Sequence, residues 1–310
     1  MHADDVLGLK DFFQELRLSN ISLDDIRYSR IHKAILDISG KATRWPSKLI
    51  DRCDAIIDIW QAKYGDLSQL VTMLYEPGGR LHGICKPEDT SCEALLIRWL
   101  RTPGISVIPS RARRHGDLGF KPGDWWINPM FAFKDGIIDS GDPNGGIVAD
   151  AASAYAVLLT DSDELSGPGP DLFRYRTRTH DRGRYRMTSA RWEARFPLRV
   201  LRSDSLRSLW APRAGVRYDG LHTVQSWSVT YDTVKKEYNY DITLKRLPGE
   251  TPMTEVMVRP WAEEVEDYKE YKRLRHQARE RRWPTKQHGH DISPAQNPSK
   301  TDRLDGMTSP

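Results

Sequence analysis

The chain has 310 residues, of which 38% are hydrophobic and 29% are charged, enough for one large domain or two modest ones. No apolar run approaches the roughly 20 residues that a membrane span requires, so we expect no membrane partner. The three Cys, at positions 53, 85 and 92, lack the spacing of paired zinc ligands, so we expect no metal and no cofactor.

Over residues 4–101, apolar residues recur every three or four positions, a pattern that predicts helices. A capping-box pair, Ser22 and Asp25, predicts the start of a helix that continues to Gly40. We therefore predict a bundle of four or five helices as a domain of residues 1–103. The first 100 residues carry 13 Lys or Arg against 15 Asp or Glu, so this domain suits docking of a partner, such as a chromatin protein, better than DNA reading.

From residue 104 to 259 the sequence changes to short β-rich runs separated by Gly, Pro, Asp and Asn, which predicts a β-barrel or strongly bent sheet with flanking helices. The fold class is therefore α+β. Residues 260–283 have the pattern of one charged helix, acidic at its start and basic at its end. Residues 284–310 are polar, which predicts a disordered tail.

Positive charge is concentrated in the predicted β-rich domain. Between Leu172 and Tyr218 there are 13 Arg, no Lys and three acidic residues. Such a patch releases counterions when a polyanion binds, and the planar guanidinium suits phosphate and guanine better than a Lys point charge does. Nucleic acid is therefore the favoured partner. The alternative is a solvated charged face, which is expected to mix Lys, Arg and Glu.

The order of short motifs between Gly116 and Leu247 carries a family resemblance. The triplet Tyr218-Asp219-Gly220 is preceded by five motifs in order: a Gly-Asp-Trp run at 123–125, a Gly-Ile segment near Gly146, an Ala-Tyr run at 154–155, "FRYR" and "PLRVLR". This set resembles the SRA-YDG (SET- and RING-associated) domain, in a fungal-type form without a RING finger. The resemblance covers about half of the chain and implies a bent β-barrel that binds DNA and flips 5-methylcytosine into a pocket.

For the flipped base, the resemblance implies a pocket with an aromatic face and polar groups for the Watson-Crick edge. Tyr175 matches the family's stacking tyrosine. The acidic residue of the family lies in the loop after the Ala-Tyr run, where Asp163 is our choice and Asp161 and Glu164 are alternatives. Gly146 and Asn144 complete the predicted pocket. The family's second stacking tyrosine has no counterpart in this loop, and the segment with a base-contacting finger is shortened to residues 176–196.

The remaining predicted site residues are arginines and the triplet itself. Alternation at the strand period places Tyr175 on one face and the row Arg174, Arg176 and Arg178 on the other. A second row with the same spacing is Arg182, Arg184 and Arg186. We expect the YDG box, Tyr218, Asp219 and Gly220, to be structural. The predicted phosphate contacts are Arg174, Arg176, Arg178, Arg182, Arg184, Arg186, Arg199 and Arg202.

These patterns predict a nuclear protein that binds double-stranded DNA and recognises methylated or hemimethylated CpG by base flipping. The alternative is a protein-interaction scaffold whose SRA-like domain is degenerate and binds DNA non-specifically or not at all. We expect no enzyme, because the sequence has no Walker loop, no Gly-x-Ser-x-Gly elbow and no His-Glu-x-x-His run.

Overall fold

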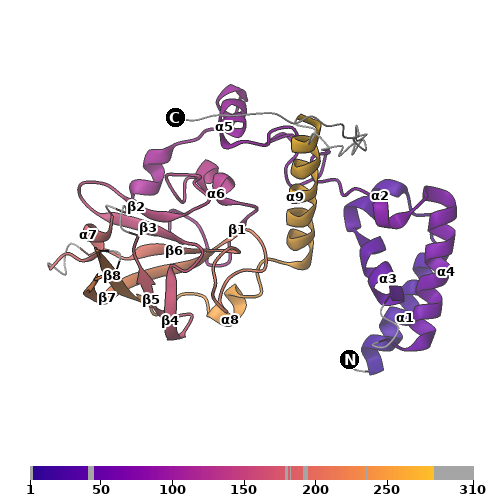
Figure 1. The fold of residues 1–310 in the computed structure, drawn as a ribbon. Coiled ribbons are helices and arrows are strands. Elements are labelled where there is room, and N and C mark those ends of the chain that lie inside the picture. Colours follow the sequence, from indigo (N-terminus) through magenta and orange to yellow (C-terminus); the bar gives the residue numbers. More distant parts are fainter. Residues whose placement is uncertain are drawn as a thin grey trace, which may run out of the picture.

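The computed structural model describes residues 3–40, 45–178, 181, 183–190, 195–234 and 236–282. Its first part is helical, and its second part is a mixed sheet with helices around it (Figure 1). None of the described helices is both long enough and apolar enough to cross a membrane. The helical elements of the first part are α1 (Ala3–Leu18), α2 (Leu23–Ser29), α3 (Ile31–Gly40), α4 (Ser47–Tyr64) and the 3₁₀ turn η1 (Leu67–Gln69).

Local sequence signals explain where these helices start and stop. The Ser22 hydroxyl accepts a hydrogen bond from the Asp25 N–H at 3.1 Å, and the Asp25 carboxylate accepts one from the Ser22 N–H, which confirms the predicted capping box. The single helix predicted as far as Gly40 was wrong, because Arg30 adopts a left-handed conformation (φ 58°) that separates α2 from α3. The chain therefore turns once more than the apolar periodicity indicates.

Helices α1 to α4 enclose a core of their own, which includes Phe13, Ile35 and Ile56. Apolar residues from Leu74 to Trp99 belong instead to a core shared with the sheet. Trp99 of α5 (Cys92–Arg101) is fully buried there, and its indole N–H donates to the Ile84 carbonyl at 2.8 Å. The packing thus changes from one core to the other just after Leu70, while the domain limits from the sequence stay a prediction.

The sheet is mixed and open. In the described part of the chain its strands run in the order β2-β3-β6-β7-β8-β5-β4, and β1 pairs separately with β7. The β3–β6 pair is parallel, and the other pairs are antiparallel. Of the two predicted alternatives, a β-barrel or a strongly bent sheet, the barrel was wrong, because no described ladder joins β2 to β4. The strands are β1 (Trp125–Trp126), β2 (Gly146–Ala149), β3 (Ala154–Leu159), β4 (Glu164–Gly169), β5 (Leu172–Arg176), β6 (Leu198–Ser203), β7 (Val216–Asp232) and β8 (Glu237–Arg246).

Side chains of the central strands supply two cores. In β3, Leu158 belongs to the core that also contains Trp99, whereas Val157 and Leu159 belong to the second core. This alternation follows from the strand period of two. The helical elements around the sheet are η2 (Pro109–Arg113), α6 (Pro129–Asp135), α7 (Arg184–Met187), α8 (Met253–Val256) and α9 (Ala262–Arg282).

Helix α9 lies between the sheet and the helices α1 to α4 (Figure 1). Tyr271 packs in the core shared with the sheet. The buried carboxylate of Asp267 pairs with Arg30 of the first helical part and, at 3.0 Å, with Arg80. Lys33 pairs with Glu266 at 2.7 Å. An apolar contact on one side and ion pairs on another therefore position α9 between the two parts.

Candidate functional site

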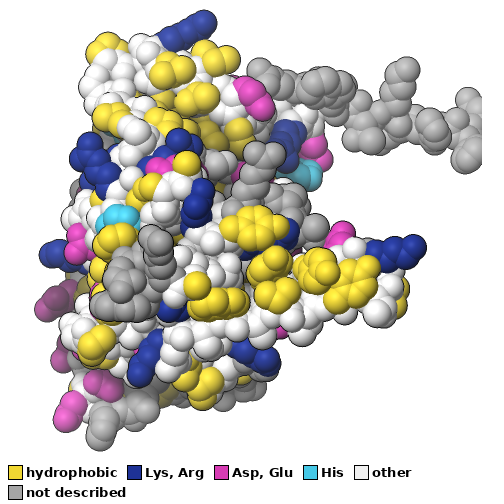
Figure 2. Space-filling model, turned by 90° about the vertical axis from the view of Figure 1, so that its left-hand side faces the viewer, with side chains coloured by type: hydrophobic (Ala, Val, Ile, Leu, Met, Phe, Trp, Pro, Cys, Tyr) yellow, Lys and Arg dark blue, Asp and Glu magenta, His cyan; other side chains and the backbone are white. Residues whose placement is uncertain are grey.

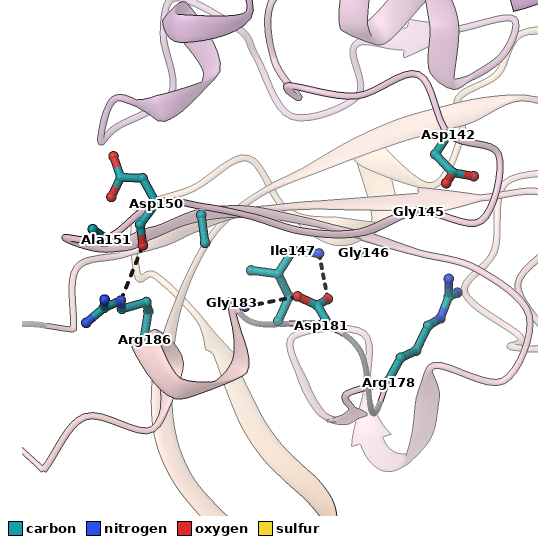
Figure 3. Close-up of a pocket in the computed structure, with 11 residues that line it drawn as sticks. Asp142, Gly145, Gly146, Ile147, Asp150, Ala151, Arg178, Asp181, Gly183 and Arg186 are labelled. Carbon is teal, nitrogen blue, oxygen red and sulfur yellow. Dashed lines mark hydrogen bonds between the residues drawn. The ribbon is translucent and has the colours of Figure 1, made fainter.

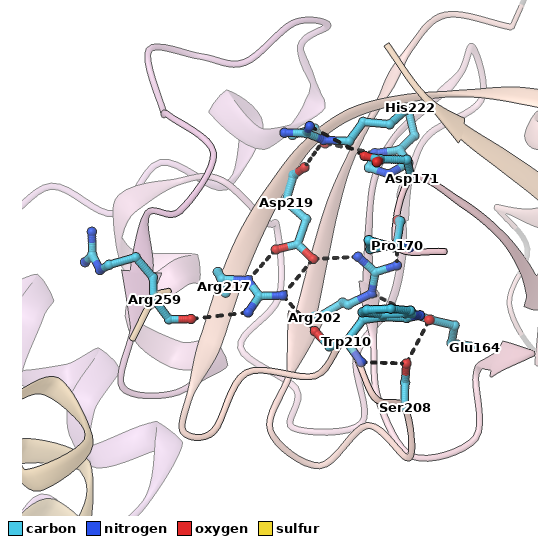
Figure 4. A network of polar contacts seen from close by, with 12 residues as sticks. Glu164, Pro170, Asp171, Arg202, Ser208, Trp210, Arg217, Asp219, His222 and Arg259 are labelled. Atoms are coloured by element: carbon cyan, nitrogen blue, oxygen red, sulfur yellow. Dashed lines mark hydrogen bonds and ion pairs between the residues drawn. The ribbon is translucent and has the colours of Figure 1, made fainter. Parts of the chain in front are cut away.

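The YDG box lies in the interior of the sheet. Tyr218 and Asp219 are both fully buried. The Asp219 carboxylate accepts hydrogen bonds from Arg202 Nη1 at 2.5 Å and from Arg217 Nε at 2.6 Å (Figure 4). Gly220 has φ 100°, and an added Cβ would lie 3.1 Å from the Arg246 side chain. The structural role of the YDG box stays a prediction.

The carboxylate of Asp219 belongs to a wider buried network (Figure 4). Arg202 also pairs with Glu164 at 2.6 Å, and Glu164 accepts a hydrogen bond from Ser208 at 2.8 Å. Burial, and then the charge of Arg202, lowers the pKa of His222 to about 3, so its ring is neutral. The network joins β4, β6 and β7, so it fixes the sheet rather than facing solvent.

Two of the predicted phosphate contacts are part of this interior. Arg202 is fully buried on Asp219 and Glu164. Arg199 is also fully buried, and its guanidinium donates to the carbonyls of Arg114 at 2.7 Å and Gly116 at 2.8 Å, as well as to that of Ala112. Burial lowers the pKa of Arg199 to about 10. A phosphate contact does not fit either placement, because the donors already point at protein oxygens.

Successive side chains of β5 point to opposite faces of the sheet, as the strand period of two predicts. Tyr175 is fully buried, whereas Arg174 and Arg176 are exposed on the other face. Arg176 makes two hydrogen bonds of 2.7 Å to Asp241 of β8. Arg178 follows the end of the strand, so it does not continue the predicted row, and its guanidinium turns to Asp163 at 2.9 Å. Arg174 makes no ion pair with the described residues.

The second predicted row of arginines is not on a strand. Arg184 and Arg186 lie on α7, a single helical turn, so the strand spacing we assumed for them was wrong. Arg184 is largely buried, and its guanidinium lies 4.8 Å from the ring centres of both Tyr185 and Tyr240. Arg186 is exposed. Arg182 lies outside the described residues.

An open pocket of about 600 Å³ lies between β2 with its flanking turns and the segment that leads into α7 (Figure 3). The Asp181 carboxylate accepts hydrogen bonds from the Ile147 N–H at 2.9 Å and the Gly183 N–H at 3.1 Å. Arg186 Nε donates to the Asp150 carbonyl at 3.2 Å. These bonds tie the two walls together. The lining residues are Asp142, Gly145, Gly146, Ile147, Ala149, Asp150, Ala151, Arg178, Asp181, Gly183 and Arg186.

Glycines allow two close approaches around this pocket, one between its two walls and one between the turn before β2 and strand β3. A Cβ on Gly183 would lie 2.6 Å from the Ile147 side chain, and one on Gly145 would lie 2.4 Å from the Leu158 carbonyl oxygen. Gly146, one of the predicted pocket residues, lines the pocket. Asn144 is exposed, does not line it, and contributes its carbonyl to a 2.7 Å hydrogen bond from the Thr160 hydroxyl.

None of the acidic residues chosen from the sequence lines the pocket. Asp163 is buried and accepts from Arg178 and from the Thr160 N–H; burial raises its pKa above the usual range, although these partners oppose the rise. Glu164 belongs to the Asp219 network, and Asp161 is exposed with φ 49°. The pocket carboxylate that the sequence analysis missed is Asp181. Its signal was available, because it is the one acidic residue among the arginines from 174 to 186.

Tyr175 does not line the pocket either, and none of the described lining residues is aromatic. Burial, followed by the charges of Asp181 and Asp163, raises the pKa of Tyr175 well above its ordinary value, so the phenol is neutral. Its hydroxyl has no hydrogen-bond partner among the described residues. An unpartnered buried donor costs about 1–3 kcal/mol.

No protein-family model and no curated protein matches the chain. Solved structures match at low identity. The SUVH5 SRA domain in a hemi-methylated CG DNA complex is 17% identical, with a TM-score of 0.36 over 43% of this chain and 93% of that one. KRYPTONITE in complex with mCHH DNA, an H3(1-15) peptide and SAH is 17% identical, with a TM-score of 0.40 over 51% of this chain and 38% of that one. The modification-dependent TagI restriction endonuclease is 20% identical, with a TM-score of 0.35, and this chain spans half of its length.

Proposed function

We propose that the protein binds double-stranded DNA and that the pocket between β2 and α7 receives a base, with modified cytosine preferred. The observation that carries the proposal is a carboxylate, Asp181, between the walls of a 600 Å³ pocket that also includes Arg178 and Arg186. A carboxylate accepts a hydrogen bond from the exocyclic amino group of cytosine. The arginines supply the positive charge that a displaced phosphate backbone needs.

The surroundings of the pocket suit this role. The backbone N–H groups of Ile147 and Gly183 hold the Asp181 carboxylate in position, so binding a base would not have to order it first. The hydroxyl of Tyr175 is neutral, because burial and the charge of Asp181 raise its pKa, and it has no hydrogen-bond partner within the described ranges. The motif order of the sequence, from the Gly-Asp-Trp run to the YDG box, supports the same role.

Binding to fluorescent duplexes that carry no, one or two methylcytosines in a single CpG tests the proposal. We expect the methylated duplexes to bind at least about tenfold more tightly than the unmethylated one, which corresponds to about 1.4 kcal/mol. A duplex with the same sequence and a methylated adenine is the matched control. Equal affinity for all duplexes would leave only general DNA binding, and no binding at about 100 mM salt would remove the proposal.

One observation favours a second candidate, a protein-interaction scaffold with a degenerate pocket. An extruded base needs an aromatic face, yet the described pocket lining has none and Tyr175 is enclosed in the core. In this case the helices α1 to α4 would dock the partner through their exposed apolar side chains, Leu7, Phe12 and Leu18. Failure of the protein to bind any duplex, together with a partner captured by residues 1–103, would favour the scaffold.

The proposed role is binding without catalysis, in the nucleus. It would be supported if a fluorescent fusion of the full chain accumulates in nuclei and is retained there after mild detergent extraction. Extraction of the fusion with the soluble proteins would count against a stable DNA partner.

A further inference from the structure

Strands β7 and β8 continue beyond the sheet as a two-stranded arm, residues 226–240. Pairing of β7 with β6 ends at His222, and pairing of β8 with β5 ends at Asp241. Pairing of β7 with β8 continues to Asp232 and Glu237. The Tyr240 carbonyl, at the base of the arm, still accepts a hydrogen bond from the Thr177 N–H at 3.0 Å. Beyond this bond, the described part of the arm has no strand beside it except its own partner.

The two faces of the arm differ in chemistry. Directly paired residues share a face, so Val229 lies beside Tyr240, and Tyr231 beside Tyr238. This aromatic face continues the buried face of the sheet, where Ile242 pairs with Trp227. The other face is polar, with the pairs Ser228–Asp241, Thr230–Asn239 and Asp232–Glu237.

The outer part of the aromatic face is exposed. Val229, Tyr231 and Tyr238 are 46%, 52% and 59% exposed, and the two tyrosine rings lie 5.0 Å apart. Figure 2 shows hydrophobic side chains gathered on a projection at the right of the view, where the arm extends. An isolated two-stranded hairpin is only marginally stable in water, so an exposed apolar face on one indicates a binding surface.

The chain covers the inner part of this face itself. The Arg184 guanidinium lies over the Tyr240 ring at 4.8 Å, and the Tyr185 ring meets that of Tyr240 edge-on at 5.7 Å. The Arg195 guanidinium lies 5.1 Å from the Trp227 ring. The outer residues Val229, Tyr231 and Tyr238 are beyond this cover, since they remain about half exposed.

The net charge of the arm indicates which class of molecule binds it. Residues 226–240 contain Asp232, Lys235, Lys236 and Glu237, so their net charge is zero, in contrast to the arginine-rich segment before them. A neutral, tyrosine-rich surface is typical of protein interfaces and unsuited to a phosphate backbone. Because charges of both signs lie at the tip, two identical arms related by a twofold axis can meet without net repulsion.

We propose that the aromatic face of the arm binds the same face of a second copy of this chain. The two half-exposed tyrosines supply on the order of 200 Å² per copy, well below the roughly 800 Å² per partner of a standard interface. The dimer is therefore weak and depends on protein concentration. It forms without DNA, so it is independent of the proposed function.

Sedimentation velocity without DNA, from about 1 to about 200 µM protein, measures this dimer. We expect the wild type to shift from monomer to dimer over that range and Val229→Lys to weaken the association at least about tenfold. Thr230→Lys is the matched control, because it adds the same charge to the next residue on the polar face. It should leave the dimer intact, and circular dichroism should show both variants folded.

Three results would overturn the proposal. A wild type that stays monomeric over the whole range has no such dimer. A dimer that survives Val229→Lys, or that Thr230→Lys disrupts equally, does not use the aromatic face. If Val229→Lys instead weakens DNA binding while the wild type is monomeric, the face belongs to the DNA interface.

Discussion

Replacing Asp219 with Asn should destabilise the protein by about 3–5 kcal/mol, because it leaves a buried guanidinium without a carboxylate. The Asp219 oxygens accept from Arg217 at 2.6 and 3.1 Å, and from Arg202 at 2.5 Å. Arg202 keeps Glu164 as a partner, whereas the other acceptors around Arg217 are the carbonyls of Trp210 and Arg259. The uncompensated charge is therefore that of Arg217.

Urea unfolding followed by circular dichroism gives the free energy of unfolding of wild type and variant. Asp241→Asn is the matched control, since it breaks a pair with the same two-bond geometry whose arginine, Arg176, is 44% exposed. We expect the control to lose about 1 kcal/mol or less. A loss below about 1 kcal/mol for Asp219→Asn would refute the reasoning, because the network would then contribute no more than a surface pair.

The ion pairs of Asp219 also predict how the free energy of unfolding depends on pH. Burial alone would raise the pKa of Asp219, but Arg217 and Arg202 outweigh it and lower the pKa below its usual value. A lowered pKa in the folded state stabilises the fold above the unfolded value of about 3.9, and this contribution is lost as the pH falls through the folded pKa. The difference between wild type and Asp219→Asn should therefore be constant from about pH 5 to 8 and shrink below about pH 4.

Two further variants test the pocket. Arg186→Ala should weaken DNA binding and reduce the slope of log affinity against log salt concentration by roughly one unit, both measured by fluorescence anisotropy. Arg174→Ala, on the exposed face of β5, is the control and should leave both the affinity and the slope unchanged. Equal effects of the two variants would show that DNA does not bind on the pocket side. Tyr175→Phe removes a hydroxyl that has no partner in the part of the chain that the structure describes, so the free energy of unfolding should rise by about 1 kcal/mol or stay the same. A loss of more than about 1 kcal/mol in urea unfolding would show that the hydroxyl is bonded in the free protein.

Local signals in the sequence predicted local structure well. The Ser22 cap is where the sequence places it. Within β5, the Tyr175 side chain points into the core and the Arg174 side chain points to solvent, because successive residues of a strand point to opposite faces. The α+β class followed from the change of period after the helical part. The left-handed Arg30 and the open edges of the sheet did not, because they depend on tertiary contacts rather than on the neighbouring residues.

The candidate site was predicted less well, because the positions of its side chains depend on contacts with residues that are far away in the sequence. Glu164 is 38 residues from Arg202, and the pocket carboxylate Asp181 reaches Ile147 across 34 residues. The resemblance implied an acidic residue in the loop after the Ala-Tyr run and so selected Asp163, which pairs with Arg178. The pocket depends on which two segments the fold brings together, and the contact of Asp181 with Ile147 that joins them has no signature in either segment alone.

The positions of the arginines in the structure change what the arginine-rich segment, residues 172–218, implies about DNA binding. Of the 13 between Leu172 and Tyr218, Arg199, Arg202 and Arg217 are buried in the core, and others pair with carboxylates. Among the described residues, the exposed arginines of this segment without an ion pair are Arg174, Arg186, Arg207 and Arg213. Among the described arginines, the unpaired charge that phosphate can reach is therefore smaller than their number in the sequence, so non-specific attraction to them supplies less affinity than that number implies. Tight binding to DNA then requires contacts inside the pocket, and this is why discrimination between duplexes is a sharper test than binding itself.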